Sequence, residues 1–436
     1  MSEEKLKYAP MYFPFKPEPA GEGCMSPRLI MRGAEDIPGA QMAVGFIVVT
    51  DPVLMKEEPH YHADADEYLA ILGGTLPDVF ASWDAEVHFY MGPTLDKMEK
   101  IVITEPTMVK VPRGWWHGPL NFVRVDKPIF FQPAILGRSA DLIKMVEENG
   151  KIKRVVITEE DPAEKEYKSV PWTVINEDGV TSYTDKGAYD DLKAPTGDDC
   201  LLMDGKESKP YSDAATLKAP KPPLSYEVSR KVLAMPREIT GWGEWCPCPQ
   251  TYFRGTIYME EATYDIGFQL YCGDVDAEVP HFHSSGEEYL FFMGPDPKNP
   301  MDFDAEIELP MGDGPDNMET QIIRSPTVVR VPPNTWHAPI RFRNVKKPVL
   351  FQAAYTAGNW GVIYRAKDRN PEEVDGTAHV RKQVYEYMGN DTRMCIYNEK
   401  KRCNICGRCF KHLNKEADEE RKKKAEAEKK AAEEAN

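Results

Sequence analysis

The sequence PHYHADADEYLAILGG, residues 59–74, recurs as PHFHSSGEEYLFFMG at residues 280–294, displaced by 221 positions. Three later segments recur in the same order with a displacement of 220: WDAEVHFYMG (83–92) as FDAEIELPMG, EPTMVKVPRGWWHGPLNF (105–122) as SPTVVRVPPNTWHAPIRF, and VDKPIFFQPAI (125–135) as VKKPVLFQAAY. Chance does not produce four ordered matches at spacings of 220 and 221 residues. The chain therefore contains a duplicated domain.

Each copy alternates short runs of β-branched and aromatic residues with Pro, Gly and Asp. Examples are AVGFIVV (43–49), IVIT (101–104) and MVKVP (108–112). Runs of this length and composition are typical of short antiparallel strands that close a sandwich or a barrel. The 37 prolines among 436 residues fit a chain with many turns and little long helix. We expect an all-β protein.

Changes in composition divide the chain into four parts. The first copy is predicted to occupy residues 1–141 and the second residues 239–370. Between them, residues 142–238 are polar and rich in Pro, with stretches such as KAPTGDDC, and are expected to pack on the barrels or to join them. Residues 371–436 contain a Cys cluster followed by KEADEERKKKAEAEKKAAEEAN, which lacks an apolar stripe and is expected to be a solvated helix.

The overall charge favours a small molecule as the main binding partner. The chain carries 54 Lys and Arg against 71 Asp and Glu, a net charge of −17, which disfavours nucleic acid and anionic membranes. The first residues have no apolar run typical of a signal peptide, and no segment approaches the roughly 18 apolar residues of a membrane-spanning helix. Nine Cys are too few for a disulfide scaffold. A soluble, cytoplasmic protein with reduced thiols is the expectation.

Six of the nine histidines fall at equivalent positions of the two copies. Two of them in each copy are spaced i, i+2, which places both side chains on the same side of a strand. A Glu follows five residues after each pair, and the third His lies on a later predicted strand. The two sets are His60, His62, Glu67 and His117 in the first copy, and His281, His283, Glu288 and His337 in the second. Three imidazoles and one carboxylate are expected to hold a divalent metal and to leave two positions of an octahedron open. The alternative is a set of core histidines hydrogen-bonded to backbone carbonyls, which a duplicated set with retained spacing disfavours.

This pattern resembles the cupin superfamily, and the duplication resembles a bicupin. The family's first motif, H-x-H followed by Glu and Gly, is matched in the first copy up to Gly74, and its second motif, P-x-G-x-x-H-x-x-x-N, is matched from Pro112 to Asn121. In the second copy Asn334 replaces the Gly of that motif and Arg341 replaces its last Asn. Asn is compatible with the turn because it also adopts the left-handed backbone conformation.

The resemblance implies a jelly-roll barrel, also called a double-stranded β-helix, in each copy. It further implies one divalent metal in each barrel, with Mn, Fe and Zn as the leading candidates. Bicupins include oxalate decarboxylases and oxidases, ring-cleaving dioxygenases, isomerases and storage globulins, so the fold does not name an activity. Storage members have typically lost their ligands, whereas both sets are complete here. Cupin barrels often pair through their sheets, so a homo-oligomer is a further expectation.

An enzyme acting on a small oxygen-rich substrate is the favoured interpretation. The first choice is non-oxidative C–C cleavage or hydrolysis of an enolisable carbonyl compound such as a cyclic diketone, with decarboxylation or isomerisation as related chemistries. In it, Glu67 or Glu288 stays a metal ligand or moves a proton, and Arg341, if its strand is regular, faces inward and pairs with an anionic substrate. A dioxygenase using Fe(II) and a non-catalytic ligand-binding or regulatory bicupin are the alternatives. Trp115, Trp116 and Trp336 could either stack on a planar substrate or pack in the barrels.

A separate motif, C-x-x-C-G-x-C, lies near the end of the chain. Its candidate ligands are Cys403, Cys406, Cys409 and His412, with Cys395 upstream. Thiolates at this spacing bind one zinc ion or three corners of an iron–sulfur cluster. A zinc site with His412 or Cys395 as its fourth ligand is preferred, because the further Cys that a ferredoxin-type cluster needs near Leu413 is missing. Free thiols on the tail are the alternative.

Overall fold

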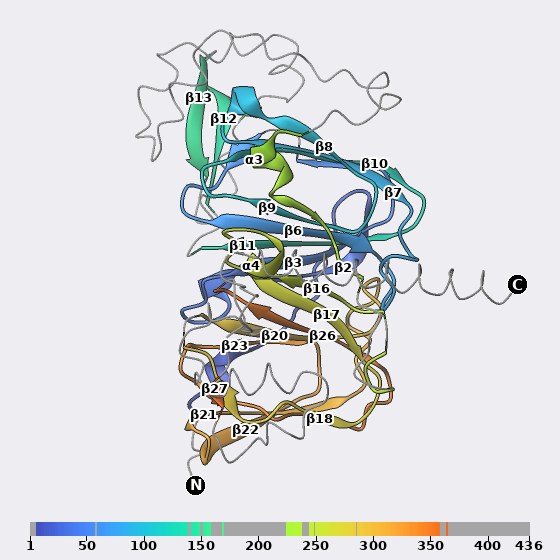
Figure 1. The fold of residues 1–436 in the computed structure, drawn as a ribbon, viewed down its shortest axis with the longest axis vertical. Coiled ribbons are helices and arrows are strands. Elements are labelled where there is room, and N and C mark those ends of the chain that lie inside the picture. The colour runs from blue at the N-terminus through green and yellow to red at the C-terminus, as the bar shows by residue number, and fades with distance from the viewer. Residues whose placement is uncertain are drawn as a thin grey trace, which may run out of the picture.

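The computed structural model describes residues 6–56, 59–137, 141–148, 151–157, 168–169, 224–237, 244–247, 249–284, 286–357 and 363–364. Within these residues the chain is almost entirely β-structure, in four sheets of antiparallel strands. The sheets form two barrels, and an inner sheet of each barrel faces the other barrel in the middle of the molecule (Figure 1). The prediction of an all-β chain with two jelly-roll barrels is confirmed.

The first barrel is closed by an inner six-stranded sheet and an outer eight-stranded sheet. The inner sheet runs in the order β15 (Val232–Ala234), β9 (Thr107–Val111), β6 (Asp66–Gly73), β11 (Ile129–Leu136), β3 (Ala43–Val49) and β2 (Cys24–Met31). The outer sheet runs β13 (Lys151–Ile157), β12 (Leu142–Glu148), β5 (His60–Tyr61), β10 (Trp116–Val125), β7 (Ala85–Gly92) and β8 (Glu99–Ile103), with β14 (Lys168–Ser169) on β12 and β4 (Val53–Lys56) on β10. β12 and β13, from the segment between the two copies, thus extend the outer sheet of the first barrel.

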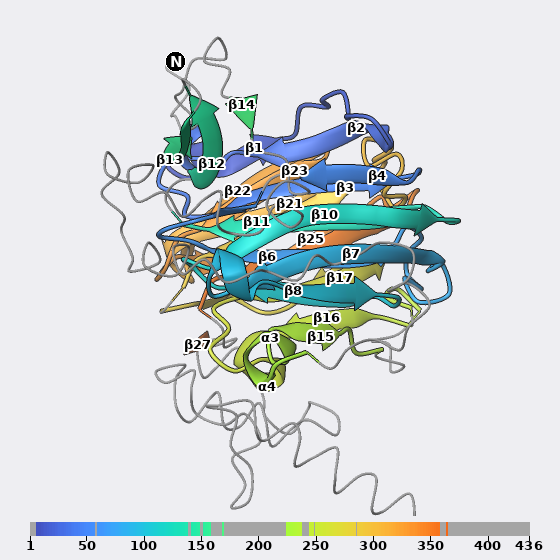
Figure 2. The same ribbon diagram turned by 90° about the horizontal axis from the view of Figure 1, so that it is seen from above.

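The second barrel repeats this plan. Its inner six-stranded sheet runs β1 (Tyr12–Pro14), β23 (Thr327–Val331), β20 (Glu288–Met293), β26 (Val349–Tyr355), β17 (Asp265–Tyr271) and β16 (Thr251–Arg254). Its outer seven-stranded sheet runs β18 (Val275–Ala277), β25 (Ile340–Arg343), β21 (Glu306–Gly314), β24 (Trp336–His337), β19 (His281–Phe282) and β27 (Ile363–Tyr364), with β22 (Asn317–Ile323) on β21. Seen from above, the strands of the two barrels lie over one another (Figure 2).

Helices in the described residues are short. They are η1 (Ala9–Met11), η2 (Gly33–Glu35), η3 (Leu95–Lys97), α3 (Tyr226–Ser229) and α4 (Gly255–Tyr258). A search of the described residues finds no helix with the length and apolar character needed to cross a membrane.

The two halves exchange edge strands. β1, from the start of the chain, pairs with β23 of the second barrel, and Tyr12 lies opposite Val329. β15, from the segment before the second copy, pairs with β9 of the first barrel, and Val232 lies opposite Val109. Both pairs of partners are displaced by 220 positions, so the exchange is itself duplicated. The segment that precedes the first barrel therefore supplies an edge strand to the second barrel, and the segment that precedes the second barrel supplies one to the first.

Three apolar cores hold the structure together. One fills each barrel, and the third lies between the two inner sheets, where Phe46 of the first barrel contacts Phe291 of the second with ring centroids 5.3 Å apart. Gln132 and Gln352, both at most 1% exposed, exchange two side-chain hydrogen bonds of 3.1 and 2.9 Å across this interface. They are equivalent residues of the two copies, so the local two-fold axis of the duplication passes between them.

The same interface holds two equivalent ionic groups. In the first, Lys110 lies 3.1 Å from Asp66 and donates to the carbonyl oxygen of Glu261 in the other half at 2.6 Å. In the second, Arg330 pairs with Glu287 and donates to the carbonyl oxygen of Pro38 at 2.7 Å. Each half therefore contributes a basic side chain, the buried Lys110 or the half-buried Arg330, that contacts the backbone of the other half.

Candidate metal centres

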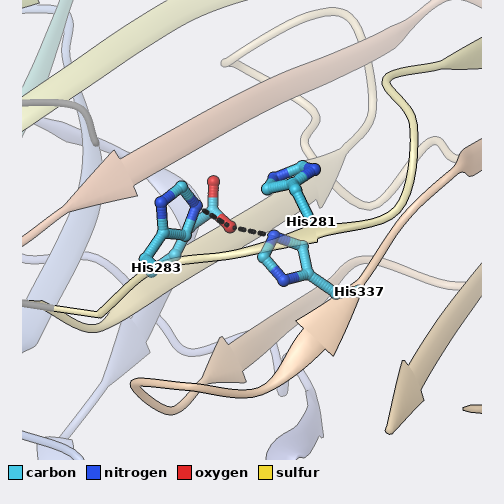
Figure 3. Close-up of side chains that lie close together, drawn as sticks. His281, His283 and His337 are labelled. Carbon is cyan, nitrogen blue, oxygen red and sulfur yellow. Dashed lines mark ion pairs between the residues drawn. The ribbon is translucent and has the colours of Figure 1, made fainter. Parts of the chain in front are cut away.

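Four buried side chains of the second barrel converge on one point. His281 on β19 lies directly opposite His337 on β24, His283 follows β19, and Glu288 begins β20. One ligand atom of each lies within 4.8 Å of the others. Glu288 Oε2 is 2.8 Å from His337 Nε2 and 3.3 Å from His283 Nε2, and Figure 3 shows both rings directed at this carboxylate oxygen.

Backbone carbonyls orient the imidazoles of this group. His281 Nδ1 lies 2.7 Å from the carbonyl oxygen of Val279, and His337 Nδ1 lies 3.0 Å from that of Thr335. A carbonyl only accepts hydrogen bonds, so Nδ1 carries the proton and Nε2 keeps its lone pair. The carbonyl contacts that would satisfy a core histidine thus occupy only one ring nitrogen. In His337 the other nitrogen, Nε2, faces the Glu288 carboxylate, so a donated Nδ1 proton leaves Nε2 on the side of the group, the arrangement typical of metal-ligating histidines.

The electrostatics of the group favour a bound cation. Burial lowers the pKa of His281 well below its ordinary value, with His337 and His283 adding to the effect, so its imidazole is neutral. Burial by itself would raise the pKa of Glu288, but His283 and His337 together hold it below its ordinary range, so the carboxylate stays charged. Three imidazoles around one buried carboxylate form a donor set that fits a divalent ion.

The first barrel holds an equivalent group with a looser fourth member. His60, His62 and His117 are buried, and their ligand atoms lie within 4.8 Å of one another. His62 Nδ1 lies 2.8 Å from the carbonyl oxygen of Asp141 and His117 Nδ1 lies 3.1 Å from that of Trp115. Glu67 Oε2 is 2.9 Å from His117 Nε2 and 3.8 Å from His62 Nε2. The carboxylate therefore lies beside the histidines rather than within the cluster of three.

The chain forms two jelly-roll barrels. Each barrel encloses the H-x-H, Glu and His side chains of the repeated motif. The chain has the bicupin fold. No family model matches the sequence, and no curated protein sequence does.

Among solved structures, the bicupin fold of this chain is similar to an oxalate decarboxylase of Lactobacillus farciminis in complex with formate. The identity is 12%, the TM-score is 0.46, and the match covers 82% of this chain and 88% of the other. A structure from a study of the Mn(II) centres of Bacillus subtilis oxalate decarboxylase matches with 10% identity and a TM-score of 0.46, over 81% of this chain and 78% of the other.

A cavity of about 250 Å³ adjoins the metal-binding group of the second barrel. Among its lining residues are His281, Glu288 and His337. Its other walls are mostly apolar, with Leu290, Ile340 and Phe351, and the polar side chains Asp265 and Gln269 on β17 also line it. The group thus faces a space large enough for a small molecule.

Sequence reasoning missed these polar lining residues. β17 and β3 are equivalent strands, DIGFQLY and AVGFIVV, aligned through their shared Gly-Phe with a displacement of 222. Asp265 and Gln269 of the second barrel therefore stand where the first barrel has Ala43 and Ile47. A comparison of the two copies strand by strand, outside the His motifs, would have shown this exchange of polar for apolar residues.

The expectation that Arg341 faces the site is wrong. The strand bearing His337 is interrupted at Ala338, which has φ 67°, so β24 and β25 are separate and the inward–outward alternation shifts by one residue. Ile340 consequently lines the cavity, whereas Arg341 lies on the outer surface, 3.9 Å from Asp276 and 3.7 Å from Glu308.

The tryptophans beside the last His ligands pack within the protein. Trp116, fully buried, lies against Tyr61 with ring centroids 4.8 Å apart, and Trp336 lies 4.9 Å from Phe282. Each precedes a ligand by one residue and so occupies the opposite face of its strand. Trp115 packs against the apolar core of the first barrel. The predicted cluster of Cys403, Cys406, Cys409 and His412, with Cys395, lies outside the described residues.

Proposed function

We propose that the protein is a metal-dependent enzyme that catalyses non-oxidative C–C cleavage by hydrolysis of an enolisable carbonyl compound, such as a cyclic diketone, in its second barrel. The observation that supports this choice of barrel is the cavity next to His281, Glu288 and His337. A substrate bound there contacts the candidate ligands directly.

The donor set supports a divalent ion with open coordination positions. His281, His283, Glu288 and His337 would hold it, and Mn, Fe and Zn all accept three imidazoles and one carboxylate. When bound, such an ion polarises a carbonyl group or lowers the pKa of a coordinated water, which is the chemistry that hydrolysis requires. Glu288 pairs at short distance with two imidazoles, which favours a fixed ligand over a residue that swings away to move a proton.

The lining of the cavity supports a small, partly apolar substrate. Its volume lies just below the roughly 300–1,000 Å³ typical of pockets for drug-sized ligands. Leu290, Ile340 and Phe351 suit a ring or alkyl body, while the polar side chains suit oxygen substituents. A six-membered cyclic diketone combines these features, since its enol oxygens can face the metal group and its methylenes the apolar wall.

The first barrel is proposed to hold a second divalent metal without carrying the reaction. The strand equivalent to β17 is apolar there: Val49 of β3 belongs to the core of this barrel, and Ile47 packs against it. A metal held by His60, His62 and His117, with Glu67 beside them, would then stabilise the fold. In this proposal Glu67 is a ligand rather than a proton carrier.

Matched substitutions in the two barrels test this proposal. His283→Ala and His62→Ala are equivalent changes, and each should remove the metal of its own barrel alone, as counted by elemental analysis of anaerobically purified protein. With cyclohexane-1,3-dione as substrate, we expect formation of 5-oxohexanoate without oxygen consumption, lost in His283→Ala and retained in His62→Ala.

Other outcomes separate the alternatives. Turnover that consumes oxygen would establish a dioxygenase, and formation of carbon dioxide from oxalate would establish a decarboxylase. If the protein binds the diketone but releases it chemically unchanged, the protein is a binding protein rather than an enzyme for this compound. Metal retained in full by both single variants would refute the assignment of the ligands.

A further inference from the structure

We infer that Asp265 is the proton donor of the second barrel's site and that its carboxyl group acts on the substrate from the wall beside the metal group. This inference rests on the proposed function. It assigns a catalytic residue that lies outside the repeated motif and has no counterpart in the first barrel, where the equivalent position is Ala43.

The strand register places Asp265 level with the metal group. Asp265 on β17 lies opposite Tyr355 on β26, and Tyr355 lies opposite Glu288 on β20. Residues directly opposite one another share a face of the sheet, so all three point into the barrel. Adjacent strands are about 4.8 Å apart, which separates the Asp265 and Glu288 backbones by roughly 10 Å. A small substrate that contacts the metal group is long enough to span the remaining gap between the side chains.

The carboxyl group of Asp265 is directed into the cavity without a protein partner for one of its oxygens. The residue is 6% exposed and lines the cavity, and its Oδ2 atom has no hydrogen-bond partner among the described residues. Four residues further along the same face of the strand, the Nε2 atom of Gln269 is also buried and without a partner within the described chain. Buried polar groups in proteins are nearly always paired, so two such atoms facing one cavity indicate a ligand that supplies the missing bonds.

The protonation state of Asp265 suits this role. Burial raises the pKa of Asp265 to about 8, and the opposing effect of Arg254 is smaller. In the protein without metal, the carboxyl group is therefore protonated at neutral pH and can donate. Titratable groups outside the cavity lining that lie near it are Tyr355 on β26, Tyr264 and Tyr68. Those that line the same cavity are Arg254, Glu288, His281, His337, Glu278, Tyr252 and Tyr271. A cation bound by the metal group would lower this pKa, because it favours the charged carboxylate.

The reaction balances with water as the only co-reactant. The oxygen of water bonds to one carbonyl carbon of the diketone, and the bond from that carbon to the CH₂ between the carbonyls breaks. The electron pair stays on the CH₂ carbon as the enolate of the second carbonyl. Asp265 donates its proton to this carbon, and the resulting carboxylate takes up the proton released by the water. The products are a carboxylic acid and a ketone in one chain, and Asp265 returns to its protonated form.

Asp265→Asn tests the assignment, since it keeps the shape of the side chain and removes the transferable proton. With Mn-loaded protein and cyclohexane-1,3-dione, we expect kcat to fall by at least about 100-fold, the usual contribution of general acid catalysis, while KM and metal content change little. The wild-type rate should fall at pH above the pKa of Asp265, and this limb should be absent from the residual activity of the variant. Asp276→Asn, on the outer surface, is the matched control and should behave as the wild type. Asp265→Glu should restore part of the activity.

An infrared difference spectrum between wild type and Asp265→Asn at pH 7, without metal or substrate, provides a reading independent of activity. It should contain the carbonyl stretch of a protonated carboxyl group. If the wild type does not hydrolyse the diketone but the band is present, the proposed reaction fails and the protonated Asp265 stands. If the band is absent, or if Asp265→Asn keeps the kcat of an active wild type, the inference is overturned.

Discussion

The reciprocal pair of Gln132 and Gln352 provides a quantitative test of how the two barrels are joined. Each carboxamide is buried, and the pair exchanges two hydrogen bonds of 3.1 and 2.9 Å on the local two-fold axis. We consider Gln132→Leu, Gln352→Leu and the double variant. Leu retains most of the side-chain volume and contains no polar atom.

The free-energy change follows from what each variant leaves behind. A single Leu removes both hydrogen bonds and leaves the other carboxamide buried without its partner, which costs about 1–3 kcal/mol in addition to the bonds themselves. We expect each single variant to lose roughly 2–3 kcal/mol of unfolding free energy. The double variant removes both carboxamides together, leaves none of them unpaired, and is expected to lie within about 1 kcal/mol of the wild type.

Urea unfolding followed by tryptophan fluorescence measures these differences, with the midpoint of the first transition compared at constant slope. Gln41→Leu, at an exposed position before β3, is the control and should change stability by less than about 0.5 kcal/mol. The reasoning fails if the double variant is less stable than either single variant. That result would show that the pair stabilises the interface directly rather than satisfying two polar groups already buried by the fold.

Two further predictions concern buried charge. In metal-free protein, Asp265 keeps its proton in the folded state up to a pKa of about 8 but loses it near 3.8 when unfolded, so the wild type should lose stability as pH rises between about 4 and 8. Asp265→Asn should lack this loss, and at pH 8 its free energy of unfolding should exceed that of the wild type by up to about 5 kcal/mol. Urea unfolding of both proteins across this pH range measures the difference. If the two curves of unfolding free energy against pH are parallel, the raised pKa of Asp265 is contradicted. Lys110→Met leaves Asp66 buried without its nearest cation and should cost roughly 2–4 kcal/mol, whereas the joint change with Asp66→Leu should recover most of it in the same assay.

Much of the architecture follows from local patterns that the duplication makes visible. Alternating apolar runs separated by Pro and Gly predict strands, and a repeat at 220 or 221 residues predicts two equivalent barrels. The spacing of His60 and His62 places both on one face of a strand. The structure brings them together with His117, about 55 residues away, because β5 and β10 are neighbouring strands.

Other features depend on contacts that no local pattern encodes. The exchange of β1 and β15 between the barrels joins segments about 315 and 125 residues from their partners, and short strands such as YFP and VLA do not specify which edge they join. Arg341 was assigned to the inner face by counting from His337, but the interruption at Ala338 shifts the alternation.

The strand-rich fold, its duplication and the two candidate ligand sets can be predicted from the amino-acid pattern, because they depend on spacings of a few residues that are repeated almost unchanged. The packing of the strands in space is needed to show which ligand set adjoins the described cavity and which carboxyl group lies opposite it. Asp265 is unremarkable in the sequence. Its raised pKa and its place in the site come from burial by strands that are distant along the chain, and burial is a property of the packed barrel rather than of any segment.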